Sequence, residues 1–202
     1  MKNKGLLLVL SGPSGCGKGT VCRRLLEKHP DMRLSVSATT REKRAGEQEG
    51  VDYFYKTREA FEAMIARGEL LEYNRGYNGN YYGTPKQYVR EQLEQGHDVI
   101  LEIEMNGAAR IKEQCPDGVF IFLAPPSLEE LHRRLIQRGR ETAEQAAERF
   151  SKAKAEIGMA SDYRYVIVND ELERAVERIE AVLQAERCLV SRNEELINEL
   201  IR

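Results

Sequence analysis

A glycine-rich segment near the start of the chain has the residue spacing with the clearest chemistry. Residues 11–20 are SGPSGCGKGT, in which four residues separate Gly12 from Gly17 and Lys18. Glycine lets main-chain N–H groups approach phosphate oxygens closely, and it tolerates the positive φ that such a turn requires. The lysine ammonium and the N-terminus of a following helix both add positive charge. The spacing therefore fits a P-loop, which binds nucleotide phosphates.

The hydroxyl position of this loop departs from the strict pattern. A P-loop usually places Ser or Thr directly after the lysine, where its hydroxyl binds Mg²⁺. This chain has Gly19 at that position and Thr20 one residue later, so direct ligation of Mg²⁺ from the loop is left open. The alternative is an ordinary strand–helix turn, and the four glycine and lysine matches in their strand–loop–helix context disfavour it.

The elements that must hold this loop are a strand and a helix. The apolar run LLLVL at residues 6–10 predicts a buried parallel strand, and residues 20–28 predict a helix. Similar patterns follow in alternation, with strands predicted at residues 34–37, 99–103, 119–123 and 165–168, and helices at residues 85–95, 128–138, 143–157 and 172–200. This alternation predicts an α/β fold, a parallel sheet flanked by helices, with sites at the carboxyl ends of the strands.

Two segments break the alternation. Residues 39–82 contain six of the nine tyrosines, short β-like pieces at residues 51–55 and 70–73, and a helical pattern at residues 58–66. We interpret this segment as an inserted lobe that carries a second substrate. Residues 133–149 are basic and helical in pattern, and we interpret them as a lid.

The composition limits the class of protein. The 202 residues fit one domain, with 41% hydrophobic and 32% charged residues. The formal net charge of −2 argues against a general affinity for nucleic acid or for a membrane surface. We see no leader-like segment and no long apolar run, and the four cysteines show no metal-binding spacing. We therefore expect a cytoplasmic protein with reduced thiols.

The motifs, taken together and in order, resemble the guanylate kinase family of bacterial type. The matching segments are SGPSGCGKGT at 11–20, SVSATTREKRAGE at 35–47, GVDYFY at 50–55, LLEY at 70–73, GNYYGTP at 79–85, LEIEMNG at 101–107, RRLIQRG at 133–139 and VIVND at 166–170. The resemblance implies a P-loop NTPase core at about residues 4–38 and 83–190, a GMP-binding lobe at about 39–82, and a lid at about 133–149. Residues 191–202 would then be a C-terminal helical extension. The activity it implies is phosphate transfer from ATP to GMP with Mg²⁺.

The resemblance also assigns an acceptor site. Residues that would hold the GMP phosphate combine guanidinium groups, which make paired hydrogen bonds to phosphate, with tyrosine hydroxyls; they are Arg41, Arg44, Tyr53 and Tyr82. Guanine presents N1–H and an amine as adjacent donors, which one carboxylate can accept together and which adenine cannot supply. The residues implied for the base are Glu72, aided by Glu104, and the hydroxyls of Ser37 and Thr84. Without the resemblance, we would interpret the tyrosines as packing residues. For the two arginines, the alternative is a solvated loop.

Two departures from the family pattern affect this site. One residue more than the usual spacing separates Glu72 from the GNYYG segment, near Gly76, and Glu104 stands where Asp is usual. Glu102 and Glu104 point to the same side of a strand because they are two residues apart. Of the two, Glu102 is the better candidate for a partner of Mg²⁺-bound water.

The donor site implied by the resemblance centres on the P-loop. Charge on the transferred phosphoryl group would be balanced by Lys18, Arg134, Arg138 and Arg149, and no general base is expected. ATP would contact Gly12, Pro13, Ser14, Gly15, Cys16, Gly17, Lys18, Gly19, Thr20 and Asn169. Asp170 either belongs to the turn near the adenine or caps the helix that follows it.

The sequence leaves open two alternative functions and the possibility of self-association. A non-catalytic, peptide-binding module of the guanylate kinase type would usually lack Lys18 or the arginines, and a ribose bisphosphate kinase would not need Glu72. The amphipathic pattern continues beyond Leu183, which suggests self-association to a homo-oligomer through the C-terminal helix. Packing of this helix on the core is the alternative.

Overall fold

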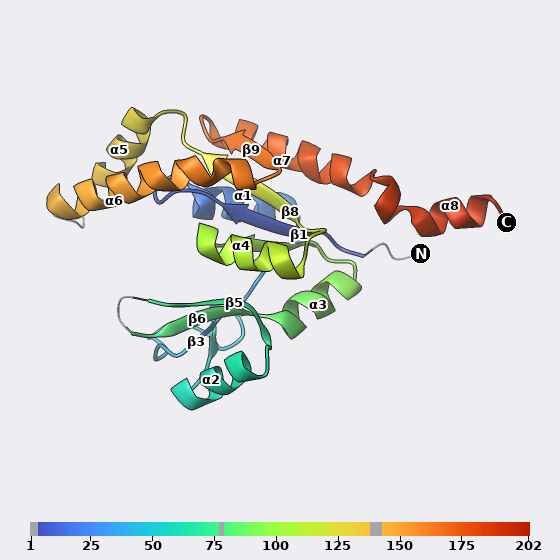
Figure 1. Ribbon diagram of the computed structural model, residues 1–202, viewed down its shortest axis with the longest axis horizontal. Coiled ribbons are helices and arrows are strands. Elements are labelled where there is room, and N and C mark those ends of the chain that lie inside the picture. Colours follow the sequence, from blue (N-terminus) through green and yellow to red (C-terminus); the bar gives the residue numbers. More distant parts are fainter. Residues whose placement is uncertain (1–3, 77–78, 138–142) are drawn as a thin grey trace. The chain divides into compact units, whose positions relative to one another are not determined.

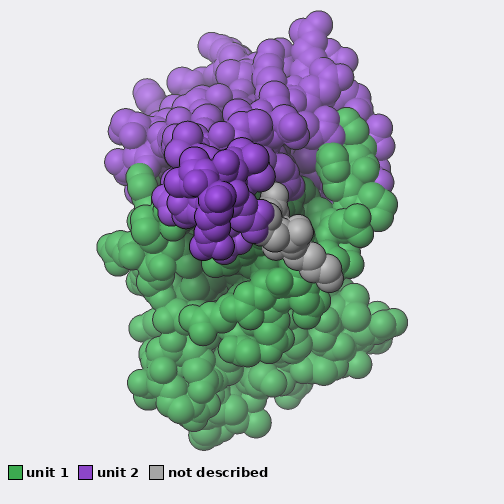
Figure 2. Space-filling view, turned by 90° about the vertical axis from the view of Figure 1, so that its right-hand side faces the viewer, with its two compact units in different colours: residues 1–11, 28–120 green, residues 12–27, 121–202 purple. Residues whose placement is uncertain are grey.

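The computed structural model describes residues 4–76, 79–137 and 143–202 and has mixed α/β structure (Figure 1). The chain divides into two compact units, which Figure 2 shows in different colours. Unit 1 comprises residues 1–11 and 28–120, and unit 2 comprises residues 12–27 and 121–202.

A parallel sheet forms one part of unit 1. Its strands β1 (Leu7–Ser11), β2 (Arg33–Leu34) and β7 (Val99–Glu102) lie in the order β2-β7-β1. Every residue of β1 is buried, as its apolar run predicts. Two helices flank β7 in the chain: α3 (Lys86–Glu94) precedes it and α4 (Met105–Gln114) follows it. Helix α4 was not predicted, although the three residues that it buries, Met105, Ala108 and Ile111, have helical spacing.

A second sheet forms the other part of unit 1. Its strands lie in the order β4 (Phe54–Tyr55), β3 (Ala38–Thr39), β6 (Tyr81–Pro85) and β5 (Leu70–Arg75). Strands β3 and β4 are parallel, whereas β6 is antiparallel to both β3 and β5. Helix α2 (Arg58–Ala66) begins at the N-cap Thr57, and its Phe61 packs with Ala38 and Leu70 in a separate small core. The segment predicted as an inserted lobe thus has a core of its own.

The strand predicted at residues 34–37 is wrong in detail. Two short strands flank this segment, and they belong to different sheets: β2 ends at Leu34 and β3 begins at Ala38. Residues 35–37 connect the two sheets, and the Ser35 N–H donates to the carbonyl of Ile100. Both serines of this connection are therefore outside regular strands and can line a cavity.

Unit 2 contains parallel strands and the helices around them. Strand β8 (Val119–Ala124) pairs with β9 (Tyr165–Val168), and the helices are α1 (Lys18–Lys28), α5 (Leu128–Gln137), α6 (Ala143–Ile157) and α7 (Leu172–Arg187). Helices α5 and α6 enclose a small core of Leu131, Leu135 and Ala153. A 3₁₀ turn, Gly158–Asp162, leads from α6 towards β9.

The single helix predicted at residues 172–200 is wrong. Helix α7 ends at Arg187, a 3₁₀ turn covers Val190–Arg192, and a separate helix α8 (Glu194–Leu200) follows (Figure 1). The break has a physical cause: the Asn193 side-chain amide donates to the carbonyls of Arg187 and Leu189, both at 2.8 Å, which satisfies main-chain acceptors at the end of α7. Across the described residues, no helix is both long enough and apolar enough to cross a membrane.

Candidate functional site

The glycine-rich loop has the backbone geometry that its sequence predicts. Gly12, Gly15 and Gly17 all have positive φ, at 152°, 87° and 97°. A Cβ at Gly12 would lie 2.3 Å from the carbonyl oxygen of Leu123, and one at Gly17 would lie 2.5 Å from Nδ2 of Asn169. Both positions therefore require glycine for space as well as for conformation.

Lys18 is the first residue of α1, two residues earlier than predicted. Its Nζ donates to the carbonyls of Gly12 at 2.6 Å and Pro13 at 3.2 Å, and it lies 3.9 Å from Sγ of Cys16. The ammonium is therefore held over the loop, where a phosphate oxygen could replace a carbonyl as its acceptor. The Ser14 N–H donates to the Glu156 carboxylate at 3.3 Å, so one amide of the loop has an anionic partner from α6.

A cavity of about 380 Å³ lies beside this loop in unit 2. It is lined by Gly15, Gly17, Thr20, Arg134, Asn169, Asp170 and Leu172. Five of these residues, all but Asp170 and Leu172, are among those predicted for ATP or for transfer. The cavity is therefore bounded by the loop, by α5 and by the residues that follow the carboxyl end of β9.

Hydrogen bonds fix the walls of this cavity. The buried Asn169 amide donates to the Cys16 carbonyl at 2.8 Å. Arg134 donates to the same carbonyl at 3.5 Å and to the Asn169 carbonyl at 3.2 Å, while its Nε donates to Glu130 at 2.7 Å. Asp170 accepts from the Glu171 N–H, and the N-cap residue of α7 is Glu171 rather than Asp170.

The two remaining arginines predicted for the donor site are not placed. Arg138 and the side chain of Arg149 lie outside the described part of the structure. Their roles therefore stay predictions, as does the lid at residues 133–149.

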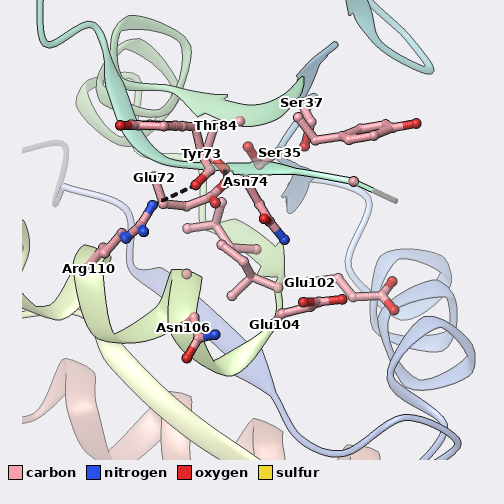
Figure 3. A pocket seen from close by; sticks show the side chains of 16 residues that line it. Ser35, Ser37, Glu72, Tyr73, Asn74, Thr84, Glu102, Glu104, Asn106 and Arg110 are labelled. Carbon is pink, nitrogen blue, oxygen red and sulfur yellow. Dashed lines mark hydrogen bonds between the residues drawn. The ribbon is translucent and has the colours of Figure 1, made fainter. Parts of the chain in front are cut away.

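A second cavity, also of about 380 Å³, lies in unit 1 (Figure 3). The β5–β6 hairpin and the β2–β3 connection contribute one part of its lining, and the end of β7 with the start of α4 contributes the other. Five of the eight residues predicted for GMP line it: Ser37, Glu72, Tyr82, Thr84 and Glu104. Glu102 and Gly76 line it as well. The structure thus brings together all four residues predicted for the guanine base.

Glu72 is held in this cavity by its neighbours, and its surroundings shift the pKa of its carboxyl group. Its register partner across the hairpin is Thr84, whose hydroxyl donates to Oε1 of Glu72 at 2.8 Å. Burial raises the pKa of Glu72, and Glu104 adds to this effect, whereas the Thr84 hydrogen bond and the Arg110 charge lower it. A Cβ at Gly107 would lie 3.2 Å from Oε2 of Glu72, so this glycine gives the carboxylate its space.

Helix α4 supports the same cavity through side chains that the sequence analysis did not identify. Arg110 donates to the Tyr73 carbonyl at 2.6 Å, and its guanidinium lies 5.4 Å from the Tyr73 ring centre. Gln114 donates to the Leu71 carbonyl at 2.6 Å. Asn106 and Arg110 line the cavity and are four residues apart, so prediction of α4 would have placed them on one helix face.

Of the four residues predicted for the GMP phosphate, Arg41 and Tyr53 lie together beside Tyr82, which also lines the cavity. The rings of Tyr53 and Tyr82 lie 6.0 Å apart, and the Arg41 guanidinium lies 5.2 Å from the Tyr53 ring centre. Arg41 forms a paired interaction with Glu47, with N–O distances of 3.1 and 2.7 Å. The side chain of Arg44 is exposed, and its main-chain N–H donates to Glu47 at 2.8 Å.

Glu47 is the residue of this cluster that the sequence analysis missed. The hydrogen bond from Arg41 is the main cause that lowers the pKa of Glu47 to about 2. Its third partner is the Tyr55 hydroxyl, at 2.7 Å; burial and this bond raise the pKa of Tyr55 to about 12. The signal in the sequence was the spacing of Arg41, Arg44 and Glu47 in one short loop.

Thr20, which the sequence left open as a Mg²⁺ ligand, is the residue of the glycine-rich segment considered for a metal. Among residues 4–76, 79–137 and 143–202, no three or more His, Cys, Asp or Glu side chains gather in a metal-binding group. Mg²⁺ in nucleotide sites keeps several waters and uses one or two protein ligands besides the phosphates. The Thr20 hydroxyl lines the cavity of unit 2 and is compatible with such a role.

The loop, its helix and the parallel strands define a nucleotide-binding protein of the α/β P-loop class. The guanylate kinase family model matches residues 4–186. A guanylate kinase of Halalkalibacterium halodurans is 55% identical over 200 residues, which are 99% of this chain and 98% of that protein. One of Caldanaerobacter subterraneus is 51% identical over 196 residues, 97% and 95% of the two chains.

A solved structure agrees with these relatives. The guanylate kinase of Anaplasma phagocytophilum matches with a TM-score of 0.72 and 37% identity, covering 95% of this chain and 90% of its own. The chain belongs to the guanylate kinase family. The resemblance and the fold class expected from the sequence are therefore confirmed.

Proposed function

We propose that this protein catalyses the ATP-dependent phosphorylation of GMP to GDP. The observation that carries the proposal is the cavity of unit 1, in which the Glu72 carboxylate is fixed by Thr84 and adjoins Glu104. A fixed carboxylate can accept from N1–H and the 2-amino group of guanine together, with charge assistance. Adenine offers no such pair of donors, so binding it would leave the carboxylate unsatisfied.

On the donor side, the loop of unit 2 would bind the phosphates of ATP. Its glycines allow the main chain to approach, Lys18 supplies charge, and Arg134 lines the adjoining cavity. Arg138 and Arg149 would add charge where the transferred phosphoryl group becomes more negative. Mg²⁺, bound to the ATP phosphates and through water or Thr20 and Glu102, would supply further charge neutralisation.

The reaction needs no base from the protein. A phosphate oxygen of GMP attacks the γ-phosphorus, the bond to the β–γ bridging oxygen breaks, and ADP leaves with that electron pair. The GMP phosphate is ionised at neutral pH, so positioning and charge stabilisation suffice. Arg41, Arg44, Tyr53 and Tyr82 would position it.

The remaining expectations belong to the same proposal. A GMP-binding lobe at about residues 39–82 and a lid at about residues 133–149 would interrupt one kinase domain, followed by the extension at residues 191–202. The enzyme would recycle GMP in the cytoplasm. The exposed apolar residues of the extension, among them Leu200 and Ile201, favour a homo-oligomer.

The test is a coupled assay of ADP release with GMP, AMP, CMP and UMP as acceptors. We expect GMP to be preferred by at least about 100-fold in kcat/KM, as expected when a base is selected by buried polar pairing. No turnover with any nucleotide would contradict the proposal and would favour a peptide-binding module. Equal turnover of GMP and AMP would contradict the assignment of the base site.

A further inference from the structure

We propose that Glu47 is a positioning residue for the acceptor phosphate: it holds Arg41 by one edge of its guanidinium and leaves the other edge for phosphate. The inference rests on the proposed function, because it concerns the phosphate of GMP. Neither Glu47 nor its partner Tyr55 was among the residues predicted for the site.

The hydrogen bonds of Arg41 divide between the two edges of its guanidinium. Nη1 and Nη2 donate to the two oxygens of Glu47, at 3.1 and 2.7 Å, and the second hydrogen of Nη1 serves the Glu42 carbonyl at 2.8 Å. Within the described residues, Nε of Arg41 forms no hydrogen bond. Nε and the second hydrogen of Nη2 lie side by side, and together they form a second planar fork. That fork matches two oxygens of a phosphate group.

Glu47 can hold Arg41 in place because it is itself fixed. Its Oε2 also accepts from the Tyr55 hydroxyl at 2.7 Å and from the Arg44 N–H at 2.8 Å. The side chains of Arg41 and Glu47 are 11% and 20% exposed. The guanidinium lies 5.2 Å from the Tyr53 ring centre and 5.9 Å from that of Tyr55. These contacts restrict rotation of the arginine before any ligand binds, which lowers the entropy cost of binding.

The cluster adjoins the guanine cavity through Tyr53. The Tyr53 ring lies 6.0 Å from the Tyr82 ring, and Tyr82 lines the cavity with Glu72 and Thr84. A nucleotide whose base occupies that cavity would carry its phosphate on the Tyr82 side. The fixed fork of Arg41 would therefore act on the phosphate and not on the base.

An argument from net charge alone predicts the opposite change in phosphate binding when Glu47 is removed. Glu47 neutralises part of the positive charge of Arg41 and Arg44, so its removal would strengthen phosphate binding if only net charge mattered. If Glu47 positions Arg41, its removal weakens binding because the arginine becomes free to rotate. The two effects are distinguished by the direction of one measured change.

The experiment measures binding of GMP and of guanosine, which lacks the phosphate, to the wild-type protein and to Glu47→Gln by calorimetry. We expect the Kd and KM for GMP to rise about tenfold, the scale of one charge-assisted interaction, with kcat changed less than about twofold. Guanosine binding should not change, and it also reports that the unit 1 cavity is intact. Glu42→Gln is the matched control, because that exposed carboxylate lies next to Arg41 in the chain.

Tyr55→Phe provides an independent variant that keeps the carboxylate. It removes the hydroxyl that braces Glu47, so GMP binding should weaken about threefold while guanosine binding stays constant. Unchanged or tighter GMP binding in both variants would overturn the inference, and so would equal losses for GMP and guanosine. If the wild-type protein itself fails to phosphorylate GMP, the proposed function fails instead, and the two failures are thereby separate.

Discussion

The two cavities are built from different parts of the chain's chemistry, one mainly from main chain and the other mainly from side chains. In unit 2, the phosphate loop relies on main-chain geometry: three glycines with positive φ and a lysine held over two carbonyls, all within seven consecutive residues. In unit 1, the cavity is lined by side chains from several strands and a helix, among them Glu72, whose carboxylate accepts a hydrogen bond from Thr84. Under the proposed function, the main-chain site would bind a group that all nucleotides share, whereas the side-chain site would select one base.

This difference predicts which variants impair catalysis and which impair selection. Substitutions in the loop should lower turnover without changing the preferred acceptor. Substitutions around Glu72 should change the preferred acceptor or the pH dependence and leave ATP use largely intact.

The largest effect is expected for Lys18→Ala. The change removes the charge that the loop supplies to the phosphates, so kcat should fall by about 100-fold or more. GMP binding, measured by calorimetry, should stay the same because Lys18 lies in unit 2 and the predicted guanine contacts lie in unit 1. Lys28→Ala, at the exposed end of the same helix, is the control. A Lys18 variant with more than about a tenth of wild-type turnover would contradict the loop assignment.

A matched pair of glycine variants sharpens the comparison. Gly17→Ala would bring a Cβ within 2.5 Å of Asn169, and Gly107→Ala would bring one within 2.8 Å of the Ile103 side chain and 3.2 Å of Glu72. The first also imposes a strained φ of 97°, which costs about 1–3 kcal/mol. We expect Gly17→Ala to raise the KM for ATP about tenfold or more, and Gly107→Ala to raise the KM for GMP by several-fold.

Steady-state kinetics with each substrate varied in turn would measure both effects. If each variant raises the KM for ATP and the KM for GMP equally, the assignment of one cavity to each substrate is contradicted.

A smaller effect concerns the pH dependence of guanine recognition. Burial raises the pKa of Glu72, while the charge of Arg110 from α4 and the hydroxyl of Thr84 from β6 oppose this and Glu104 adds to it. Because the ionised form accepts from guanine, kcat/KM for GMP should fall as pH drops through this raised pKa. Arg110→Gln removes a charge that lowers the pKa of Glu72, so the acid limb should move to higher pH.

The matched control is Lys112→Gln, since Lys112 is an exposed cation on the same helix. An acid limb that stays in place in Arg110→Gln would show that Arg110 does not influence the ionisation of Glu72.

The two cavities also differ in how far the sequence alone predicts them. The loop was predicted from its residues, because its geometry is local and ten consecutive residues determine it. The guanine residues were named only by resemblance, since Ser37, Glu72 and Glu104 are far apart in the chain and meet through two sheets and α4. The role proposed for Glu47 depends on its side-chain bonds to Arg41 and Tyr55. The spacing of Arg41, Arg44 and Glu47 places them in one loop but does not specify these bonds.

Two errors in the predicted elements have local causes. Helix α4 contains Gly107, a poor helix former, within its first turn, so its helical pattern was weak. The long C-terminal helix was predicted from apolar spacing alone, but Asn193 caps the end of α7 and buried Glu186 accepts from Arg192 of the following turn. Specific polar contacts of this kind override periodicity.

The most direct test of the account compares kcat/KM for GMP and for AMP in the wild-type protein and in Glu72→Gln. We expect a strong preference for GMP in the wild type that falls by about 10-fold or more in the variant, because an amide cannot accept from both guanine donors with charge assistance. Turnover with the better acceptor should still depend on Lys18. An unchanged ratio of GMP to AMP would contradict the claim that the unit 1 cavity selects the base.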